Sequence, residues 1–312
     1  MGISATAYCW GFYGHARIHH YAIYLLPPEM MVFYKPNQIF LEEHATDPDK
    51  RRYMIPEEGP RHYIDMDHYG VAPYVDLPRE WKKACEKYSE DSLKAHGIVP
   101  WHIQVMLARL TRSFKEHDVA GILKNSADLG HYVADAHVPL HASSNHNGQK
   151  TGQHGIHGFW ESRVPELLAS KQFSFFIGKA VYLKDPARFI WERVEESAAA
   201  ADSVLRLEKQ LSIQFASTGK YAYEDRNGKM VKQYSSDYTI AYNSQLQGMV
   251  ERRMRQSVLA VASFWFTAWV NAGQPDLKNL THVSFSEEDK QQFLWLQQAW
   301  QKGDRMMGRS ED

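Results

Sequence analysis

Cysteine is scarce in this chain of 312 residues, which contains only Cys9 and Cys85. A disulfide framework therefore cannot be what stabilises the fold. A strong charge of either sign is also absent, because 36 basic residues nearly balance 37 acidic ones. This balance gives no electrostatic basis for binding duplex DNA or an anionic membrane through the field of the whole protein. A nucleic acid or a lipid would have to be bound locally.

Apolar runs long enough to span a bilayer are absent as well. The nearest is LAVASFWFTAWVNA at 259–272, which is too short for a span and follows the charged ERRMRQ, so we predict a buried helix there. Residues 1–9, MGISATAYC, are too short for a complete signal peptide. They are either a disordered N-terminus or the remnant of an export signal, since Ala7 and Cys9 fit a signal-peptidase site before Trp10. The second alternative predicts a periplasmic or secreted protein.

Apolar residues recur at helical spacing along most of the chain. They predict helices at about 16–33, with an interruption at Pro27 and Pro28, and at about 99–116, 118–136, 157–168, 186–214, 236–271 and 285–307. Residues 221–234 instead contain an Asn-Gly turn between two short β-like runs, which predicts a small hairpin. We find no internal repeat and no linker. The prediction is one all-α domain at 10–275, followed by a helical C-terminal extension at 276–312.

What the chain has in abundance is histidine. Of its 16 histidines, a group crowds one short stretch: His131, His137, His141, His146, His154 and His157. On a helix, His131 and Asp135 lie one turn apart on the same face, where both side chains can bind one metal ion. His157 and Glu161 repeat this spacing, and His141 follows the helix-ending Pro139. A single pair of this kind is more often a surface or capping pair, but two pairs separated by a polar loop predict a metal site.

The motifs GHYVADAHVPLH (130–141) and HGFWE (157–161) resemble, in this order, the core of the bacterial zinc phospholipases C and of the single-strand-specific zinc nucleases of fungi and plants. WGFYGH at 10–15 resembles the mature N-terminus of the nucleases, and RHYIDMD at 61–67 resembles the segment that carries their next histidine. The likeness therefore extends from Trp10 to Glu161. It implies an all-α fold that holds three zinc ions in a cleft.

Carried over position by position, the resemblance implies three sets of zinc ligands. The first set is His62, His131, Asp135 and an upstream aspartate, the second is His141, His157 and Glu161, and the third is Trp10, His15 and the other oxygen of Asp135. Trp10 would bind through its free amino group and carbonyl oxygen, so only a protein processed to begin there would hold three zinc ions rather than two.

The upstream aspartate is either Asp47 or Asp49. Asp49 fits the Asp-x-x-Arg pattern of the family through Arg52, whereas Asp47 fits the usual spacing to His62 better. Asp47 also precedes a proline and has the position of a helix cap, which would give it a structural role. We favour Asp49, and we expect Asp135 and Asp49 to be the catalytic carboxylates.

The resemblance implies hydrolysis of phosphodiester bonds. Zinc would support this reaction because it lowers the pKa of a bound water from 15.7 to about 7, which supplies hydroxide at neutral pH. The substrate is less clearly indicated. The spacing from Trp10 to His15 and the presence of His137 are nuclease-like, whereas Glu161 and the lack of disulfides are phospholipase-like. We favour an endonuclease acting on single-stranded nucleic acid, with a phospholipase C acting on phospholipid headgroups as the alternative. A second alternative is a non-catalytic helical protein stabilised by zinc. No protein partner is predicted.

Overall fold

The computed structural model describes residues 11–215, 219–226, 228–280, 283–302 and 306–307. The protein is 66% helical, and its described residues form a single two-stranded sheet, which confirms the predicted all-α class with a small hairpin. The α-helices are α1 (Gly11–Ile23), α2 (Pro28–Tyr34), α3 (Gln38–Glu43), α4 (Asp47–Arg51), α5 (Trp81–Tyr88), α6 (Glu90–Ala95), α7 (Val99–Glu116), α8 (Val119–Asp135), α9 (Ile156–Gly158), α10 (Val164–Gln172), α11 (Pro186–Gln214), α12 (Ser236–Gln245), α13 (Met249–Asn271) and α14 (Glu287–Lys302).

Shorter elements connect these helices. They are the 3-10 helices η1 (Gly59–His62), η2 (Met66–Tyr69) and η3 (Pro139–Ala142), the π-helical turn η4 (Phe159–Arg163), and the strands β1 (Tyr221–Arg226) and β2 (Lys229–Tyr234). The strands pair antiparallel, with Tyr221 opposite Tyr234 and Arg226 opposite Lys229. The predicted hairpin at 221–234 is thereby confirmed.

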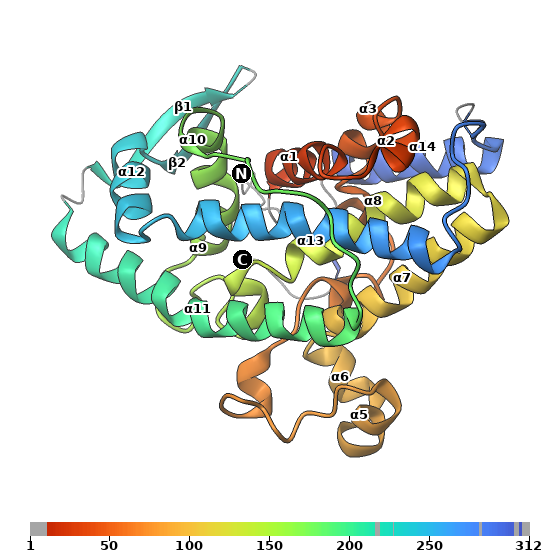
Figure 1. The fold of residues 1–312 in the computed structure, drawn as a ribbon. Coiled ribbons are helices and arrows are strands. Elements are labelled where there is room, and N and C mark those ends of the chain that lie inside the picture. Colours follow the sequence, from red (N-terminus) through yellow and green to blue (C-terminus); the bar gives the residue numbers. More distant parts are fainter. Residues whose placement is uncertain (1–10, 216–218, 227, 281–282, 303–305, 308–312) are drawn as a thin grey trace.

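Helix α13 runs through the middle of the molecule and packs against α1, α7 and α8 (Figure 1). Its apolar residues are buried on nearly all sides, which is typical of a helix inside a core. Where α13 meets α8, the indole of Trp265 donates a hydrogen bond of 2.9 Å to the carbonyl oxygen of Ser126. This packing fixes α8, whose C-terminal end carries His131 and Asp135.

Some predicted boundaries were wrong. The helix predicted at 236–271 is divided by Gly248, whose φ of 75° is left-handed, whereas the interruption predicted at Pro27 and Pro28 does separate α1 from α2. The stretch just before residue 99, where no helix was predicted, contains α5 and α6. These two short helices bury little apolar surface, since Ala84 and Leu93 are their buried residues. Helix α5 nevertheless has apolar residues at helical spacing, at Trp81, Ala84, Cys85 and Tyr88, which the prediction overlooked, whereas the six-residue α6 is too short and polar to show such a pattern.

The hairpin lies at one end of the molecule beside α10 and α12, while α5 and α6 project from its lower side (Figure 1). Helix α14 packs against α4. Among the described residues, none of the helices combines the length and the apolar character needed to cross a membrane.

Candidate metal centre

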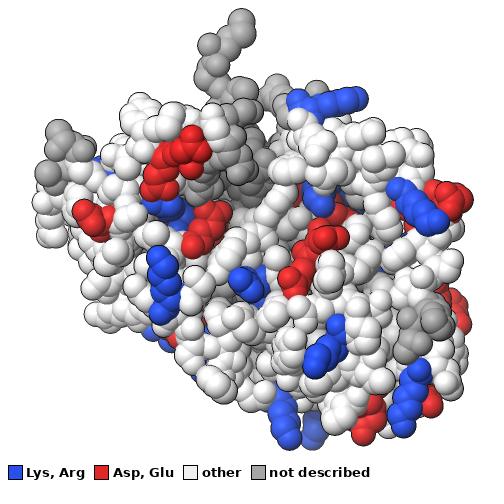
Figure 2. All heavy atoms as spheres, turned by 90° about the horizontal axis from the view of Figure 1, so that it is seen from above, with Lys and Arg blue, Asp and Glu red and all other residues white. Residues whose placement is uncertain are grey.

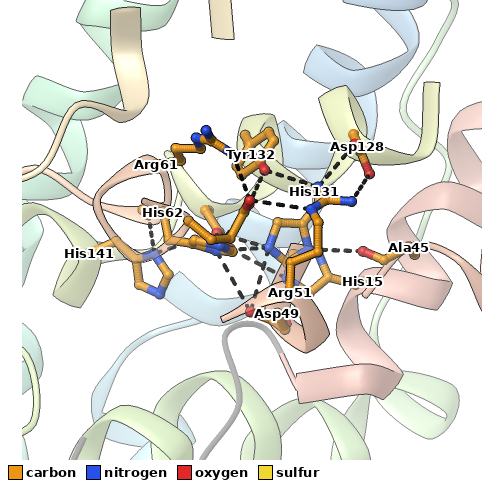
Figure 3. Close-up of polar contacts among 12 residues, drawn as sticks. His15, Ala45, Asp49, Arg51, Arg61, His62, Asp128, His131, Tyr132 and His141 are labelled. Atoms are coloured by element: carbon orange, nitrogen blue, oxygen red, sulfur yellow. Dashed lines mark hydrogen bonds and ion pairs between the residues drawn. The ribbon is translucent and has the colours of Figure 1, made fainter. Parts of the chain in front are cut away.

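Most of the predicted metal ligands meet in the interior of the molecule. Helix α8 supplies two of them, and the other elements supply one each: His15 from α1, Asp49 from α4, His62 from η1, His131 and Asp135 from α8, His141 from η3, His157 from α9 and Glu161 from η4. Each of these side chains is at most 3% exposed. Figure 3 shows several of them converging from separate segments. Trp10, the remaining predicted ligand, lies outside the described residues.

The helical spacing on α8 has the expected consequence. Nε2 of His131 lies 3.2 Å from Oδ2 of Asp135 on the next turn. The other ring nitrogen of His131, Nδ1, lies 2.8 Å from the carbonyl oxygen of Ala45. Because a carbonyl oxygen can only accept, Nδ1 carries the proton and Nε2 is left with a lone pair that faces the cluster.

His141 is oriented in the same way. Its Nδ1 donates a hydrogen bond of 2.7 Å to the carbonyl oxygen of His62, and its Nε2 lies 3.5 Å from Oε2 of Glu161. His157 lies on the other side of this carboxylate, with Nε2 at 3.1 Å from the same oxygen. The second predicted pair at four-residue spacing therefore also converges, across the π-helical turn η4.

Asp135, which belongs to α8, lies between His15 and His62. Its Oδ1 lies 3.3 Å from Nε2 of His15, and its Oδ2 lies 2.9 Å from Nδ1 of His62. The two oxygens of one carboxylate thus face different histidines. Burial opposes ionisation of Asp135, but its interactions with the rings of His131 and His141 outweigh this and hold its pKa well below the usual value.

Three groups of side chains could each hold a metal ion: His15, Asp49 and His131; His62, His131 and Asp135; and His141, His157 and Glu161. Within each group the ligand atoms lie within 4.8 Å of one another. The last group is one of the sets implied by the resemblance, and the second contains the three histidine and aspartate ligands of another set without its upstream aspartate. The first differs, because it joins Asp49 to His15.

Asp49, and not Asp47, lies in the cluster. Its Oδ1 is 3.6 Å from Nε2 of His131 and 3.7 Å from Nδ1 of His62. Asp47 instead pairs with Nδ1 of His44 at 2.5 Å and with Nζ of Lys50 at 2.9 Å. Asp47 is the first residue of α4 and not its cap, so the predicted capping role was wrong. Its structural role consists of these two pairings instead.

The chemistry of the cluster fits metal ions. Both ring nitrogens of His15, both carboxylate oxygens of Asp49 and Nε2 of His141 are buried without a hydrogen-bond partner among the described residues. Leaving such a group unsatisfied costs about 1–3 kcal/mol. Imidazole nitrogens and carboxylate oxygens are the usual ligands of zinc and other divalent transition metals. A bound cation would satisfy these groups together.

Two pKa values in the cluster are shifted in directions that a bound cation would oppose or remove. Burial raises the pKa of Asp49 to about 6, against the charge of His62. Burial also lowers the pKa of His62, but the carboxylates of Asp135 and Glu58 outweigh it and raise this pKa to about 9. Carboxylates and imidazoles here compete for protons at distances at which they could share a metal ion instead.

Glu58 is the residue that sequence reasoning missed. It is fully buried, and its Oε1 lies 3.5 Å from Nε2 of His62. Its carboxylate accepts hydrogen bonds from Nη1 of Arg61 at 2.7 Å, from Nε of Arg51 at 3.2 Å and from the hydroxyl of Tyr132. Arg51 also reaches Asp128 on α8 (Figure 3). The signal in the sequence is the four-residue spacing from Glu58 to His62.

Two other predicted features have structural roles. Nδ1 of His137 donates a hydrogen bond of 2.7 Å to the carbonyl oxygen of Val133, inside its own turn, and His137 belongs to none of the three groups. Gly130, the first residue of the motif at 130–141, allows a side chain of α1 to approach closely, because a Cβ there would collide with the ring of His19. Nε2 of His19 lies 3.0 Å from the carbonyl oxygen of Ala127, and this contact joins α1 to α8.

Comparisons with known proteins give no relative, since no family model, curated protein or solved structure matches the chain. The centre must therefore be interpreted from its own geometry, which brings eight of the nine predicted ligands into three buried groups that could hold metal ions.

Proposed function

We propose that this chain is a zinc-dependent hydrolase of phosphodiester bonds that binds three zinc ions. The observation that carries this proposal is the position of Asp135, whose Oδ1 faces His15 at 3.3 Å and whose Oδ2 faces His62 at 2.9 Å. A carboxylate whose two oxygens face separate groups of ligands fits a hydrolase in which neighbouring metal ions act on one phosphate.

The number of ligands supports catalysis over a purely structural role. Each group contains three described side chains, but two of the groups share His131. Its one free ring nitrogen can bind a single ion, so one of these two groups would have two described ligands when all the ions are bound. Catalytic zinc sites typically have three protein ligands and keep a further position open, whereas structural sites are closed by four. A helical protein that uses zinc only for stability is therefore the weaker alternative.

Zinc bound at these groups would supply a Lewis acid that activates water and neutralises the charge of the phosphate. The residues of the chain prepare the site for it. His131 and His141 present an unprotonated Nε2, because each donates its Nδ1 proton to a backbone carbonyl. Asp135 is ionised and would orient the attacking water, with Asp49 as the second carboxylate. Burial of the cluster excludes bulk water and strengthens each of these electrostatic interactions.

We further propose single-stranded nucleic acid as the substrate. On the face shown in Figure 2, basic and acidic side chains are interspersed rather than gathered into a field of one sign. Duplex binding depends on neutralising many phosphates at once, which such a surface does not favour. A strand whose bases are accessible can instead be bound by local contacts close to the metal ions.

The test combines metal analysis with turnover of bis-p-nitrophenyl phosphate, with and without a chelator. We expect three zinc ions per chain, hydrolysis of this diester, and loss of both after chelation. Asp135→Asn should abolish turnover and loosen two of the metals, whereas Asp202→Asn, a change at an exposed aspartate on α11, should alter neither. Three bound zinc ions without hydrolysis would favour the non-catalytic alternative. Parallel assays on single-stranded DNA, RNA and phosphatidylcholine separate a nuclease from a phospholipase C.

We also propose that the protein is exported and processed to begin at Trp10. Gly11, the first described residue, lies against Ser162, which follows Glu161 in η4, and a side chain at position 11 would collide with it. N-terminal sequencing of the protein from its natural host tests the processing. A protein that still begins at Met1 would lack the amino ligand, and we would then expect two zinc ions.

A further inference from the structure

The β-hairpin carries a strip of aromatic and basic side chains on one face. In the antiparallel register, Tyr221, Tyr223 and Asp225 of β1 share this face with Met230, Lys232 and Tyr234 of β2. The contacts agree with the register, because the rings of Tyr221 and Tyr234 lie 5.0 Å apart and Nζ of Lys232 lies 4.4 Å above the ring of Tyr221. We call Tyr221, Tyr223, Met230 and Lys232 the hairpin strip.

The outer part of the hairpin strip is exposed to solvent. Tyr223 is 69% exposed, Met230 is 64% exposed and Tyr221 is 40% exposed. Burying such apolar side chains against a partner is favourable. A cluster of them exposed on one small surface is therefore typical of a binding site.

The base of the hairpin is fixed to the turn that carries two of the predicted metal ligands. Tyr234 stacks on Phe159 with ring centroids 3.8 Å apart, and Phe159 lies between His157 and Glu161 in the chain. From the same turn, Nε of Arg163 donates a hydrogen bond of 3.0 Å to the carbonyl oxygen of Tyr234. The hairpin strip therefore extends from a rigid anchor next to the metal centre.

Lys232 is the basic group of the hairpin strip, and its side chain is exposed. Asp225 lies on the same face, opposite Met230, where its Oδ1 accepts a hydrogen bond of 2.9 Å from the backbone N–H of Gly228. The other acidic residue of the hairpin, Glu224, is neutralised by Arg163, whose Nη2 lies 2.5 Å from its Oε1. At the foot of the hairpin, Nζ of Lys220 lies 5.7 Å from the centre of the Tyr234 ring and pairs with the buried Glu208 at 2.8 Å, so its charge is already compensated. The hairpin strip thus combines exposed tyrosines with one exposed lysine.

We propose that the hairpin strip binds single-stranded nucleic acid outside the metal centre, with bases stacking on Tyr223 and phosphates contacting Lys232. Aromatic faces interleaved with basic groups are the usual means of binding single strands without sequence preference. Insertion into a membrane would favour a broader apolar surface with Trp, Phe or Leu side chains. This inference rests on the proposed function, since it names the polymer that the same enzyme would cut.

Equilibrium binding of the metal-loaded protein to a fluorescent phosphorothioate oligothymidine, which resists cleavage, tests the inference by anisotropy. We expect Tyr223→Ala to weaken binding roughly tenfold, as removal of one stacking partner typically does. The matched control is Tyr182→Ala, because Tyr182 is 45% exposed, does not belong to the hairpin and donates a hydrogen bond from its hydroxyl to Asn271 at the end of α13. Hydrolysis of bis-p-nitrophenyl phosphate, which is too small to reach the hairpin, should be unchanged in both variants.

Equal binding by the wild type and Tyr223→Ala, or no binding by the wild type, would overturn the inference. So would binding to vesicles of phosphatidylcholine and phosphatidylglycerol that depends on Tyr223 while binding to the oligothymidine does not. These results are separate from the proposed function, which fails only if the wild type cannot hydrolyse a phosphodiester.

Discussion

The carboxylate of Glu58 lies 3.5 Å from Nε2 of His62, while Nδ1 of the same ring lies 2.9 Å from Asp135. His62 is thus held between a carboxylate of the cluster and a buried carboxylate behind it. Burial opposes ionisation of Glu58, but the charge of Arg51 and a hydrogen bond from His62 outweigh it and lower its pKa well below the usual value. A carboxylate behind a metal-binding histidine fixes the ring and makes its other nitrogen a stronger ligand.

Glu58→Gln should therefore weaken metal binding. Glutamine keeps the shape but removes the charge, so we expect a loss of roughly 10- to 100-fold in zinc affinity, as found for other groups behind metal ligands. Competition with a chromophoric chelator measures this affinity. Glu57→Gln is the matched control, because Glu57 is the exposed neighbour of Glu58. Equal affinities in the two variants would show that Glu58 only pairs with Arg51 and Arg61.

The two candidate aspartates of α4 should respond differently to the same substitution. Asp49→Asn removes a carboxylate 3.6 Å from Nε2 of His131, so we expect about one zinc ion fewer per chain and turnover reduced by more than about 100-fold. Asp47→Asn breaks the ion pairs with His44 and Lys50 instead. It should keep its zinc and lose roughly 1–2 kcal/mol of stability. Metal analysis and urea unfolding distinguish the two, and zinc loss in Asp47→Asn alone would reverse the assignment.

The parts of the site that could be predicted are those set by local geometry. His131 and Asp135 are recognisable because helical periodicity alone places them on one face. The same spacing in His157 and Glu161 identified the second pair. The upstream aspartate could not be chosen from spacing, because Asp47 and Asp49 lie two residues apart and tertiary contacts decide which one faces the cluster. Glu58 is one of 37 acidic residues, and its role depends on the packing of Arg51 and Tyr132 around it.

The fold shows the same division between local and tertiary information. Long helices with a periodic apolar face were predicted, and the Asn-Gly turn identified the hairpin. The short α4 was indicated only by its Asp-Pro start, and a helix of five residues cannot be stable alone. Its position depends on partners far away in the sequence. One of these is α14, which belongs to the predicted C-terminal extension.

Helix α14 should therefore stabilise the corner that carries Asp49. The ring of Phe293 lies 4.3 Å from that of His44, just before α4, and Asp289 pairs with Lys124 of α8. Phe293→Ala should lower the free energy of unfolding by about 1–2 kcal/mol, less than for a fully buried phenylalanine because the side chain is partly exposed.

The same substitution should speed the release of zinc to a chelator, since α14 packs against the helix that carries Asp49. Leu294→Ala is the matched control, because Leu294 is the neighbouring residue and is 50% exposed. If Phe293→Ala destabilises the chain but releases zinc at the wild-type rate, then α14 supports the fold without supporting the metal centre.

A buried histidine away from the cluster makes the stability depend on pH. Burial, together with the charge of Arg61, lowers the pKa of His102 to about 3, whereas an unfolded histidine has a pKa of about 6.5. The unfolded chain therefore binds more protons than the folded one between these values. The contribution of His102 to stability is fully present above pH 6.5 and is lost as the pH falls towards 3, by up to about 1.4 kcal/mol per pH unit.

Urea unfolding of the metal-free protein across this pH range measures the effect. Groups of the metal-binding cluster titrate in this range too. The informative quantity is therefore the difference in the free energy of unfolding between the wild type and His102→Gln. Glutamine takes up no proton, and we expect the variant to lose stability less steeply as the pH falls from about 6.5 to 3. His154→Gln, a change at an exposed histidine, should follow the wild type. Parallel curves for the wild type and His102→Gln would mean that the ring beside Tyr132 becomes protonated without unfolding.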